Sequence, residues 1–398
     1  MVAAPEARDI VVVGGGPAGS AAAIFLRQRG HDVLVLDEAR FPRDKVCGEG
    51  VSPEAWRLLA AMGAAEEVRA LQPHPLRGME LTSPDGTRFR GLYRGVADAG
   101  FALRRRDLDA CLLAAARRAG AEVREGTRAA SLIRRDGRVG GVMTSDGAGE
   151  IPIEARLVVG ADGRRSMVAR QLGLLHEHPR LRKYAVRGYW SGVEGLGEHG
   201  EMHVVAGGYC GIAPLAPTEA NVAFVVDRAA MRASAGDLEG FYRATLGRWP
   251  RVAERLARAT LTEPPRAIGP LALEAGRVSV PGAALVGDAA GFYDPFTGEG
   301  VTLALRGAEI LADVADRALR DGASLGEYDR LRAEATRDKF RLNRLLQRVV
   351  AWPALANGVA RRLARRPDLA DRLVGIAGDF VPARTALGAR FVWELLTS

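Results

Sequence analysis

The chain has few cysteines, few aromatic residues and no long apolar run, and each shortage argues against a class of protein. Its three cysteines, Cys47, Cys111 and Cys210, are odd in number and far apart, so we expect a reducing compartment and no disulfide framework. No stretch reaches the roughly 18 uninterrupted apolar residues of a membrane-spanning helix. The first apolar run is short, lacks a basic flank and leads into a glycine turn, unlike a secretory signal. These features predict a cytoplasmic protein.

Repeats and low-complexity tracts are also missing. With 398 residues, 47% of them apolar and 26% charged, the chain can form a large core in two or three lobes. The formal net charge is +8, and residues 339–398 hold 11 basic and 4 acidic residues. Aromatic residues make up only 6% and no nucleic-acid module is recognisable, so we expect no nucleic-acid partner.

The histidines do not form a metal-binding pattern. His199 and His203 are four residues apart, but Gly200 stands where a zinc-protease motif requires glutamate. The residues after Gly200 are typical of a strand. In a strand, His199 and His203 would not lie together on one helix face, as the zinc motif requires. We therefore predict no metal site.

Three glycine-rich segments, spread over almost 300 residues, are the informative features of the sequence. The first, Gly14-x-Gly16-x-x-Gly19, follows a β-branched apolar run at residues 10–13, which is typical of a buried parallel strand. Gly14 permits a tight turn, Gly16 lets the backbone approach a pyrophosphate, and Gly19 lets the next helix pack closely. The helix N-terminus then offers free N–H groups to phosphate. This segment predicts a dinucleotide site.

The other segments favour FAD over NAD. A second strand at 33–36 ends in Asp37, which lies 18 residues after Gly19 and suits a hydrogen bond to a ribose hydroxyl. Asp288 follows a short strand at 284–286, at the sheet edge where ligands of α/β folds gather. Its carboxylate can accept hydrogen bonds from a ribityl chain, which NAD lacks. A glycine-rich turn then leads into a helix over 301–319, whose N-terminus can stabilise negative charge on a reduced flavin.

At this point the chain resembles flavoproteins with the hydroxybenzoate-hydroxylase fold, and among them the geranylgeranyl reductase family. The matching motifs are Gly14-x-Gly16-x-x-Gly19, Phe41-Pro42-Arg43-x-Lys45-x-Cys47-Gly48-Glu49-Gly50, Gly160-Ala161-Asp162-Gly163, Gly287-Asp288 and Thr297-Gly298-Glu299-Gly300. The resemblance covers roughly residues 8–325. It implies FAD contacts from Ala18, Asp37, Cys47, Gly48, Gly50, Arg105, Ala129, Asp288, Gly300 and Val301.

The resemblance also implies an α/β fold in which a Rossmann-like FAD domain is interleaved with an antiparallel-sheet substrate domain and followed by a helical C-terminus. We assign residues 1–75, 100–175 and 266–325 to the FAD domain, residues 76–99 and 176–265 to the substrate domain, and residues 326–398 to the helical region. Strands are expected at 184–191, 201–206 and 221–226, and a helix near 237–247. The substrate is expected between that sheet and the flavin.

Two residues are candidates for a part in the chemistry. Cys47 is expected beside the flavin, where it can donate a proton, although a small buried packing residue is the alternative. Isoprenoid reductases carry Tyr-x-Trp-x-Phe-Pro over the substrate tunnel, whereas the corresponding stretch here reads Tyr209-Cys210-Gly211-Ile212-Ala213-Pro214. Tyr209 remains, as a catalytic or a core aromatic, but two rings are replaced by small residues. Each absent ring vacates about 150–250 Å² of buried contact, so we expect a wider pocket.

The leading hypothesis is an FAD-dependent reductase of carbon–carbon double bonds in an isoprenoid or other lipid-like substrate. Only one dinucleotide fingerprint is complete, so NADPH, NADH or another reduced donor is expected to dock transiently. Gly291 supports the reductase hypothesis, because aromatic hydroxylases usually have histidine at that position. An FAD-dependent monooxygenase acting on a polyketide or aromatic compound and a non-catalytic binding protein stay open as alternatives. Halogenation is disfavoured because the tryptophan-rich halogenase signature is missing.

The C-terminal region is basic and amphipathic. Its apolar stripe consists of Leu342, Leu345, Leu346, Val349 and Val350, and it is flanked by Arg341, Arg344 and Arg348. Pro353 and Pro367 divide the region into short helices. Such a stripe packs on its own protein or rests on an anionic membrane, here the inner face, and both alternatives stay open. The sequence predicts no particular oligomeric state.

Overall fold

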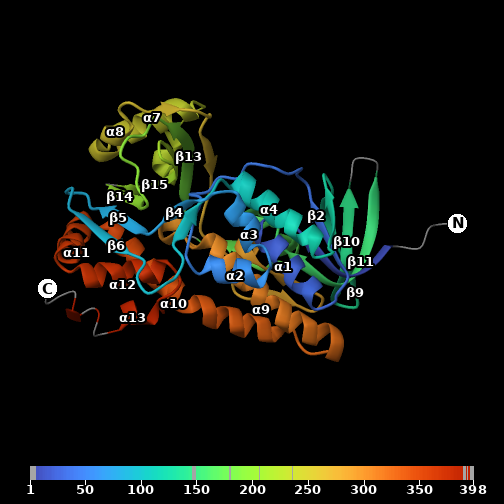
Figure 1. The fold of residues 1–398 in the computed structure, drawn as a ribbon. Coiled ribbons are helices and arrows are strands. Elements are labelled where there is room, and N and C mark those ends of the chain that lie inside the picture. Colours follow the sequence, from blue (N-terminus) through green and yellow to red (C-terminus); the bar gives the residue numbers. More distant parts are fainter. Residues whose placement is uncertain are drawn as a thin grey trace.

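The computed structural model describes residues 6–145, 149–178, 181–205, 207–234, 236–388, 391 and 393–394. The described residues form two large sheets at different ends of the molecule, and helices near the C-terminus run between the two sheets (Figure 1). The mixed α/β architecture confirms the predicted fold class. Among the described helices, none combines the length and apolar character needed to cross a bilayer.

The first sheet positions the glycine segments. Its strands are β1 (Glu6–Val13), β2 (Val33–Asp37), β8 (Glu122–Glu125), β9 (Arg128–Arg135), β10 (Arg138–Ser145), β11 (Glu150–Gly160), β20 (Ser279–Val280) and β21 (Ala283–Leu285). Strand β1 lies between β2 and β11, and β21 pairs with β11, all in parallel. Val13 is opposite both Leu36 and Gly160. The carboxyl ends of these strands therefore meet at one edge, where Gly14, Asp37 and the turn after β21 follow.

Helices pack around this sheet because its central strands β1, β2 and β21 are buried and apolar where they pair. They are α1 (Pro17–Gln28), α2 (Ala55–Ala61), α3 (Ala65–Ala70), α4 (Arg105–Arg118), α5 (Met167–Leu172) and α9 (Gly300–Asp321). Helix α1 packs against α4 and α9. Gly14 has a φ of +105°, and a Cβ on Gly19 would lie 1.8 Å from the Gly14 carbonyl oxygen, so both positions require glycine. This contact is the close helix packing expected from the fingerprint.

The second sheet contains β5 (Gly78–Thr82), β6 (Arg88–Leu92), β13 (Lys183–Ser191), β14 (Gly200–Val205), β15 (Gly208–Ala216), β16 (Glu219–Asp227), β17 (Thr260–Leu261) and β18 (Arg266–Ile268). The three strands predicted for it form, although residue 206 lies outside the described residues. Strand β15 completes the sheet between β14 and β16. Helices α6 (Arg228–Arg232), α7 (Leu238–Gly247) and α8 (Pro250–Leu256) follow β16. Strand β18 pairs with β13, just past the expected domain boundary at residue 265.

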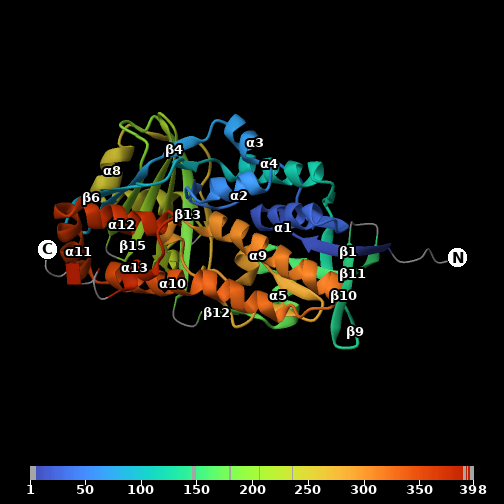
Figure 2. The same ribbon diagram turned by 60° about the horizontal axis from the view of Figure 1, so that its bottom comes forward.

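Smaller elements connect the two sheets. Strands β3 (Gly50–Val51), β4 (His74–Leu76) and β7 (Gly100–Ala102) form one small sheet, and β12 (Leu175–Glu177) pairs with β19 (Leu273–Ala275). The C-terminal helices are α10 (Gly326–Ala351), α11 (Pro353–Arg365), α12 (Pro367–Ala377) and α13 (Arg384–Leu387). Helix α10 runs from beside α9 to the second sheet, and α11 and α12 pack on β6 (Figure 2). The helical C-terminal region is thus tied to both sheets.

Candidate functional site

A cavity of about 730 Å³ lies at the carboxyl edge of the first sheet and extends to the face of the second. It brings the three glycine segments together although they are far apart in the sequence. Of the residues singled out from the sequence, those that line it are Gly14, Gly16, Ala18, Asp37, Cys47, Gly48, Gly50, Arg105, Ala129, Tyr209, Asp288, Gly300 and Val301. Gly19 lies behind this wall, packed against Gly14.

Asp37 organises the end of the cavity next to β2. Its carboxylate accepts hydrogen bonds from the Gly15 N–H at 2.7 Å and the Ala39 N–H at 2.8 Å. A carboxylate has about four acceptor positions, so Asp37 can still bind a ribose hydroxyl. The nearby N-terminus of α1 begins with Pro17, which needs no hydrogen-bond acceptor at that position. This end of the cavity therefore presents a hydroxyl acceptor beside a helix N-terminus.

Arg105 is the one member of its arginine triplet that lines the cavity. It makes a bidentate ion pair with Asp109, at 2.7 and 2.8 Å, and both side chains are buried. Arg43 donates to the same carboxylate at 2.9 Å. Two guanidinium groups thus share one carboxylate, which leaves an excess of positive charge at the wall. Arg104 instead lies over the Tyr189 ring, at 4.2 Å from its centroid.

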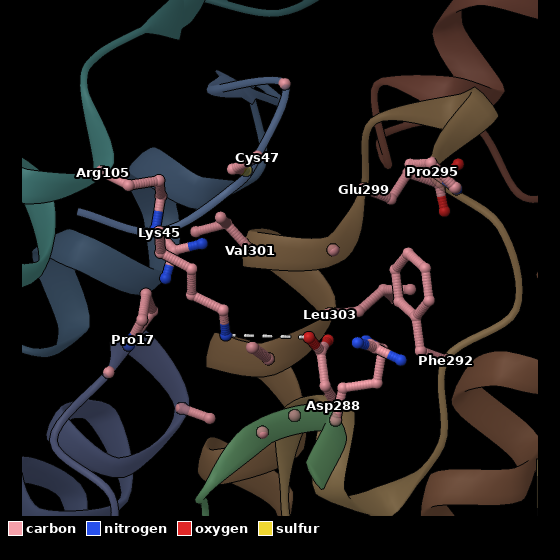
Figure 3. Close-up of a pocket in the computed structure, with 18 of the residues that line it drawn as sticks. Pro17, Lys45, Cys47, Arg105, Asp288, Phe292, Pro295, Glu299, Val301 and Leu303 are labelled. Atoms are coloured by element: carbon pink, nitrogen blue, oxygen red, sulfur yellow. Dashed lines mark ion pairs between the residues drawn. The ribbon is translucent and has the colours of Figure 1, made fainter. Parts of the chain in front are cut away.

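Lys45 and Asp288 reach toward one another from opposite walls of the cavity (Figure 3). Lys45 Nζ lies 3.8 Å from an Asp288 carboxylate oxygen. Burial lowers the pKa of Lys45, and the positive charge of Arg105 acts in the same direction. Asp288 belongs to the short turn Gly287–Ala290 that follows β21. The pair thus places a hydrogen-bond donor, the Lys45 ammonium, and an acceptor, the Asp288 carboxylate, on facing walls of the cavity.

The segment that carries Cys47 is fastened to the second sheet. Asp44 accepts two hydrogen bonds, at 2.6 and 2.7 Å, from the guanidinium of the buried residue Arg187. The Cys47 carbonyl accepts a hydrogen bond from the Asn221 side chain at 2.9 Å, and the Cys47 Sγ lies 3.4 Å from the Glu49 backbone nitrogen that donates to it. The thiol is therefore positioned in the cavity wall by contacts to the second sheet.

Glu49 is the most enclosed acid of this segment. It is 1% exposed and has a φ of +62°, a backbone conformation that is unfavourable for residues other than glycine. Its carboxylate accepts hydrogen bonds from the Tyr189 hydroxyl, the Asn221 amide at 3.1 Å and the Arg105 N–H at 3.1 Å. Burial raises the pKa of Glu49, which these hydrogen bonds oppose. With this many partners, Glu49 holds the Cys47 segment in place.

Tyr209 lies on β15 where the second sheet faces the turn before α9. Its hydroxyl donates to an Asp294 carboxylate oxygen at 2.5 Å, and its ring meets Phe296 edge-on at 5.0 Å. Burial and the Asp294 charge raise the pKa of Tyr209 well above its ordinary value, so it stays protonated. Asp294 also accepts the Phe296 N–H at 3.0 Å. These contacts make Tyr209 a positioning group for the turn; a direct part in the chemistry stays a prediction.

A buried charged cluster supports the start of α9. Lys339 of α10 lies 3.0 Å from a Glu299 carboxylate oxygen and also pairs with Asp379. Burial and the neighbouring Asp379 charge raise the pKa of Glu299 to about 8. Ser52 donates to Asp379 at 3.2 Å. Two carboxylates and one ammonium therefore join the C-terminal helices to the Gly298–Gly300 turn.

The residues present fit a flavin dinucleotide. A Cβ on Gly48 or Gly298 would meet no atom within 4 Å, so the cavity stays open beside both turns. The Asp162 Oδ1 atom is buried without a hydrogen-bond partner, whereas Oδ2 accepts the Met167 N–H at 2.6 Å. Asp162 therefore organises its own turn and keeps one acceptor atom unused. The cavity offers phosphate donors at α1, hydroxyl acceptors at Asp37 and Asp288, and a glycine-lined turn at the far end.

Several residues of the site were not identified from the sequence as site residues. They are Lys45, Arg187, Tyr189, Asn221, Asp294 and Lys339. Lys45 belongs to a motif that had been matched as a whole, so its position in the motif was an available signal. Arg187 and Tyr189 alternate with apolar residues along a predicted strand, and this alternation marks a polar face toward the cavity. No sequence pattern connects Lys339 with Glu299.

Comparisons with known proteins agree with this geometry. A family model described as "FAD binding domain" matches residues 7–187, and one described as "Squalene epoxidase" matches residues 154–344. A menaquinone reductase of Mycolicibacterium smegmatis is 32% identical over 325 residues, which cover 77% of this chain and 76% of that protein. A digeranylgeranylglycerophospholipid reductase of Methanosarcina acetivorans is 30% identical over 329 residues, which cover 79% of this chain and 76% of that protein.

Solved structures share the fold. A geranylgeranyl bacteriochlorophyll reductase-like protein of Thermoplasma acidophilum superposes with a TM-score of 0.77 and 22% identity, covering 99% of this chain and 97% of the other. The myxobacterial chondrochloren halogenase superposes with a TM-score of 0.80 and 25% identity, covering 99% of this chain and 90% of the other. The fold is therefore common to proteins whose reactions differ.

Proposed function

Because the chain belongs to the geranylgeranyl reductase family of FAD-dependent oxidoreductases, we propose that it reduces carbon–carbon double bonds of an isoprenoid or other lipid-like substrate. The reductases among its relatives act on menaquinone and on digeranylgeranylglycerophospholipids, as their names state. Both are molecules with long apolar chains. The proposal transfers this substrate class, and neither particular substrate, to the chain.

The apolar side of the cavity is the observation that carries the proposal. Ala185, Met202, Val225 and Leu271 of the second sheet and its flank form a buried apolar cluster with Tyr209, and Phe292 and Phe296 pack against it. All of these residues line the cavity. A polar aromatic substrate would leave its polar groups unpaired against such a wall, at a cost of about 1–3 kcal/mol for each group. A hydrocarbon chain has no such groups to bury.

The small residues on β15 set the width of the apolar side of the cavity. A Cβ on Gly211 would meet its nearest neighbour, the Met202 methyl carbon, at 3.7 Å, an ordinary contact distance. Gly211 and Ala213 both line the cavity, where the reductases of similar motif carry large rings. The chain thus has room for a substrate that is bulkier than a single extended isoprenoid chain. A polyprenyl quinone or a branched lipid fits this description.

The residues of the cavity would have separate roles in binding FAD and the substrate. The helix α1 N-terminus and Asp37 bind the nucleotide part of FAD, and Asp288 and the start of α9 bind its flavin part, with Arg105 and Ala129 as further contacts. Bound FAD supplies hydride transfer to the substrate. Cys47 and Tyr209 are the candidate groups for holding or moving a proton at the substrate. Lys45 fixes the orientation of Asp288 through their ion pair.

The reductant is the second part of the proposal. Because one dinucleotide fingerprint accounts for the FAD site, NADPH or NADH would bind transiently on the open side of the cavity. Exposed arginine side chains are suited to a phosphorylated nucleotide. Stopped-flow mixing of the purified protein with each nucleotide, followed by flavin absorbance, identifies the donor. Bleaching by neither nucleotide would point to a reduced protein partner instead.

The test of the reaction is product analysis with and without oxygen. The purified protein is incubated with a reductant and a polyprenyl quinone or an unsaturated isoprenoid lipid, and products are identified by mass. A reductase gives a product heavier by two hydrogen atoms under anaerobic conditions. A product that contains an added oxygen atom and forms only in air would replace this proposal with the monooxygenase alternative.

The monooxygenase alternative has one observation in its favour. The squalene epoxidase model matches residues 154–344, which include most of the second sheet and the turn before α9. From the sequence, the monooxygenase alternative is expected to act on a polyketide or aromatic compound, and the squalene epoxidase match adds an isoprenoid hydrocarbon to these substrates. For a lipid substrate the two readings differ in the use of oxygen, and contact of the basic C-terminal region with a membrane surface suits both.

A further inference from the structure

The corner between α10 and α11 is apolar and exposed. The five consecutive residues 351–355 (Ala-Trp-Pro-Ala-Leu) are all exposed, and Trp352 is 70% exposed. Leu345 on α10, seven residues before Trp352, is also exposed. Three of the six large apolar side chains that are exposed in the described part of the chain thus lie within Leu345–Leu355. Such clustering is typical of an interaction surface, because singly scattered exposed apolar residues are the norm elsewhere.

Positive charge surrounds this corner. The segment 341–366 contains seven arginines and no acidic residue. Arg344 and Arg348 are exposed on α10, and Arg361 and Arg365 are exposed on α11. Arginines around exposed tryptophan and leucine are the composition of helices that lie in the interface of an anionic membrane. Figures 1 and 2 show α11 at the end of the molecule opposite the N-terminus, away from the first sheet.

The inner faces of the same two helices line an apolar passage. A cavity of about 100 Å³ lies between them and the strands β5, β6 and β14. Its walls include Leu346, Val350, Ala356 and Val359, next to the exposed corner. At its other end it shares wall residues with the large cavity, and these are Met79, Met202, Phe296, Thr297 and Ala377. The passage therefore lies beneath the corner and adjoins the substrate side of the large cavity, with these five residues between the two spaces.

We infer that residues 345–355 insert into the interface of an anionic membrane and that an apolar chain of the substrate enters the large cavity through the passage beneath them. This inference rests on the proposed function for the identity of the cargo as a lipid. The insertion itself rests only on the apolar corner and its arginines. Arg361 is already paired with Asp85, whereas Arg344 and Arg348 form no ion pair among the described residues. A membrane, rather than a second protein, suits this corner because anionic lipid headgroups can supply the counter-charge for Arg344 and Arg348.

Vesicle sedimentation of the flavin-loaded full chain tests the insertion. Vesicles of phosphatidylcholine alone are compared with vesicles that also contain phosphatidylglycerol. Trp352→Glu should abolish binding to the anionic vesicles, whereas Ile151→Glu should not, although Ile151 is also 50% exposed. Ile151 lies on β11 in the first sheet and is a matched control for placing a charge at an exposed apolar site. Equal binding by the wild type and Trp352→Glu, or no binding by the wild type, would overturn the inference.

The arginines give a graded version of the same test. Each basic residue near an anionic surface contributes roughly fivefold to partitioning, so Arg344→Gln combined with Arg348→Gln should weaken binding by about 25-fold. Arg243→Gln is the control, because Arg243 is an exposed arginine on α7, away from the corner. A loss of about fivefold in this single-charge control, the same factor per arginine, would mean that overall charge, and not this corner, drives binding.

Filling the passage with a bulky side chain tests whether the apolar chain of the substrate enters there. Val359→Trp should lower kcat/KM for menaquinone with a long polyprenyl tail by tenfold or more and leave the value for a quinone with a single prenyl unit within twofold. Ala356→Trp is a second plug at a more enclosed position, and melting temperature shows whether either variant is folded. Equal losses with both quinones in folded variants would overturn the route. If the wild type turns over neither quinone, a long and a short unsaturated isoprenoid lipid replace them in the same comparison. Turnover of none of these substrates would contradict the proposed function and the route together, and leave the vesicle result standing.

Discussion

Replacing Lys339 with methionine removes the ammonium that Glu299 and Asp379 share and keeps a side chain of similar length. The Lys339 side chain is 12% exposed, and those of Glu299 and Asp379 are 6% and 0% exposed. The two carboxylates would then be buried together, with Arg306 as the nearest remaining cation of the cluster. Because these groups connect α10 and the turn after α12 to the start of α9, we expect lower stability and weaker flavin retention.

The magnitude follows from the cost of an unpaired buried charge. Removing one partner of a buried ion pair costs about 3–5 kcal/mol. With an unfolding entropy of about 2.1 cal/mol/K per residue, a chain of 398 residues has roughly 0.8 kcal/mol/K, so Tm should fall by about 4–6 °C in one cooperative transition. Glu299 has a pKa of about 8 and can bind a proton at neutral pH, so the smaller fall is expected at pH 7 and the larger above pH 8.

Thermal unfolding followed by circular dichroism and by flavin fluorescence measures both effects. Arg341→Met is the matched control, because Arg341 lies on the same helix in an exposed pair with Asp338. Exposed pairs contribute about 0.2–1 kcal/mol, so the control should melt within about 1 °C of the wild type. Adding Asp379→Asn to Lys339→Met should restore part of the loss, as neighbouring sites are not additive. If Lys339→Met melts no lower than Arg341→Met, the buried cluster does not hold the turn and the reasoning is refuted.

Four further outcomes are expected. Asp288→Ala should reduce flavin occupancy of the purified protein at least tenfold, whereas Asp313→Ala, at an exposed position on α9, should not; equal occupancy would contradict a ribityl contact. Cys47→Ala should lower kcat with a change in Tm below about 2 °C; an unchanged kcat would leave the thiol a packing residue. Gly211→Trp should raise KM for bulky quinones far more than for a linear isoprenoid, and an equal change for both would remove the wider-pocket argument. The folded-state pKa of Glu299 is about 8 against an ordinary 4.5, so its contribution to stability is present below pH 4.5 and lost as pH rises to 8. Glu299→Gln should therefore flatten the decrease of Tm across that range, and an identical slope would contradict the raised pKa.

The strands and the glycine turns could be predicted because their signals are local. Residues 10–13 and 33–36 are apolar on every position, and both form buried parallel strands at the centre of the first sheet. Gly14 and Gly19 have steric requirements that no other residue meets, so their spacing carries structural information. The expected helices after residues 237 and 300 begin within one residue of the observed starts.

The contacts that the second sheet and α10 make with the loops of the site could not be predicted, because they join residues far apart in the sequence. Arg187 and Asp44 are 143 positions apart, and each is unremarkable in its own segment. Glu299 belongs to a recognised motif, but its partner Lys339 lies on a helix that the motif does not include. The charged partner of a buried acid depends on how the domains pack, and a linear pattern contains no record of that packing. Beyond about residue 325 the family resemblance is only a general helical one, so it predicted helices there but not the contacts of α10.

The two loops beside the flavin site are held by different parts of the molecule. The Cys47 segment is fastened to β13 and β16 through Arg187 and Asn221, whereas the Glu299 turn is fastened to α10 through Lys339. The variable residues of β15 belong to neither set of contacts. Substitutions at Gly211 can therefore reshape the substrate side without loosening either flavin loop. In this chain, therefore, the substrate side can change while the loops of the cofactor site keep their supports.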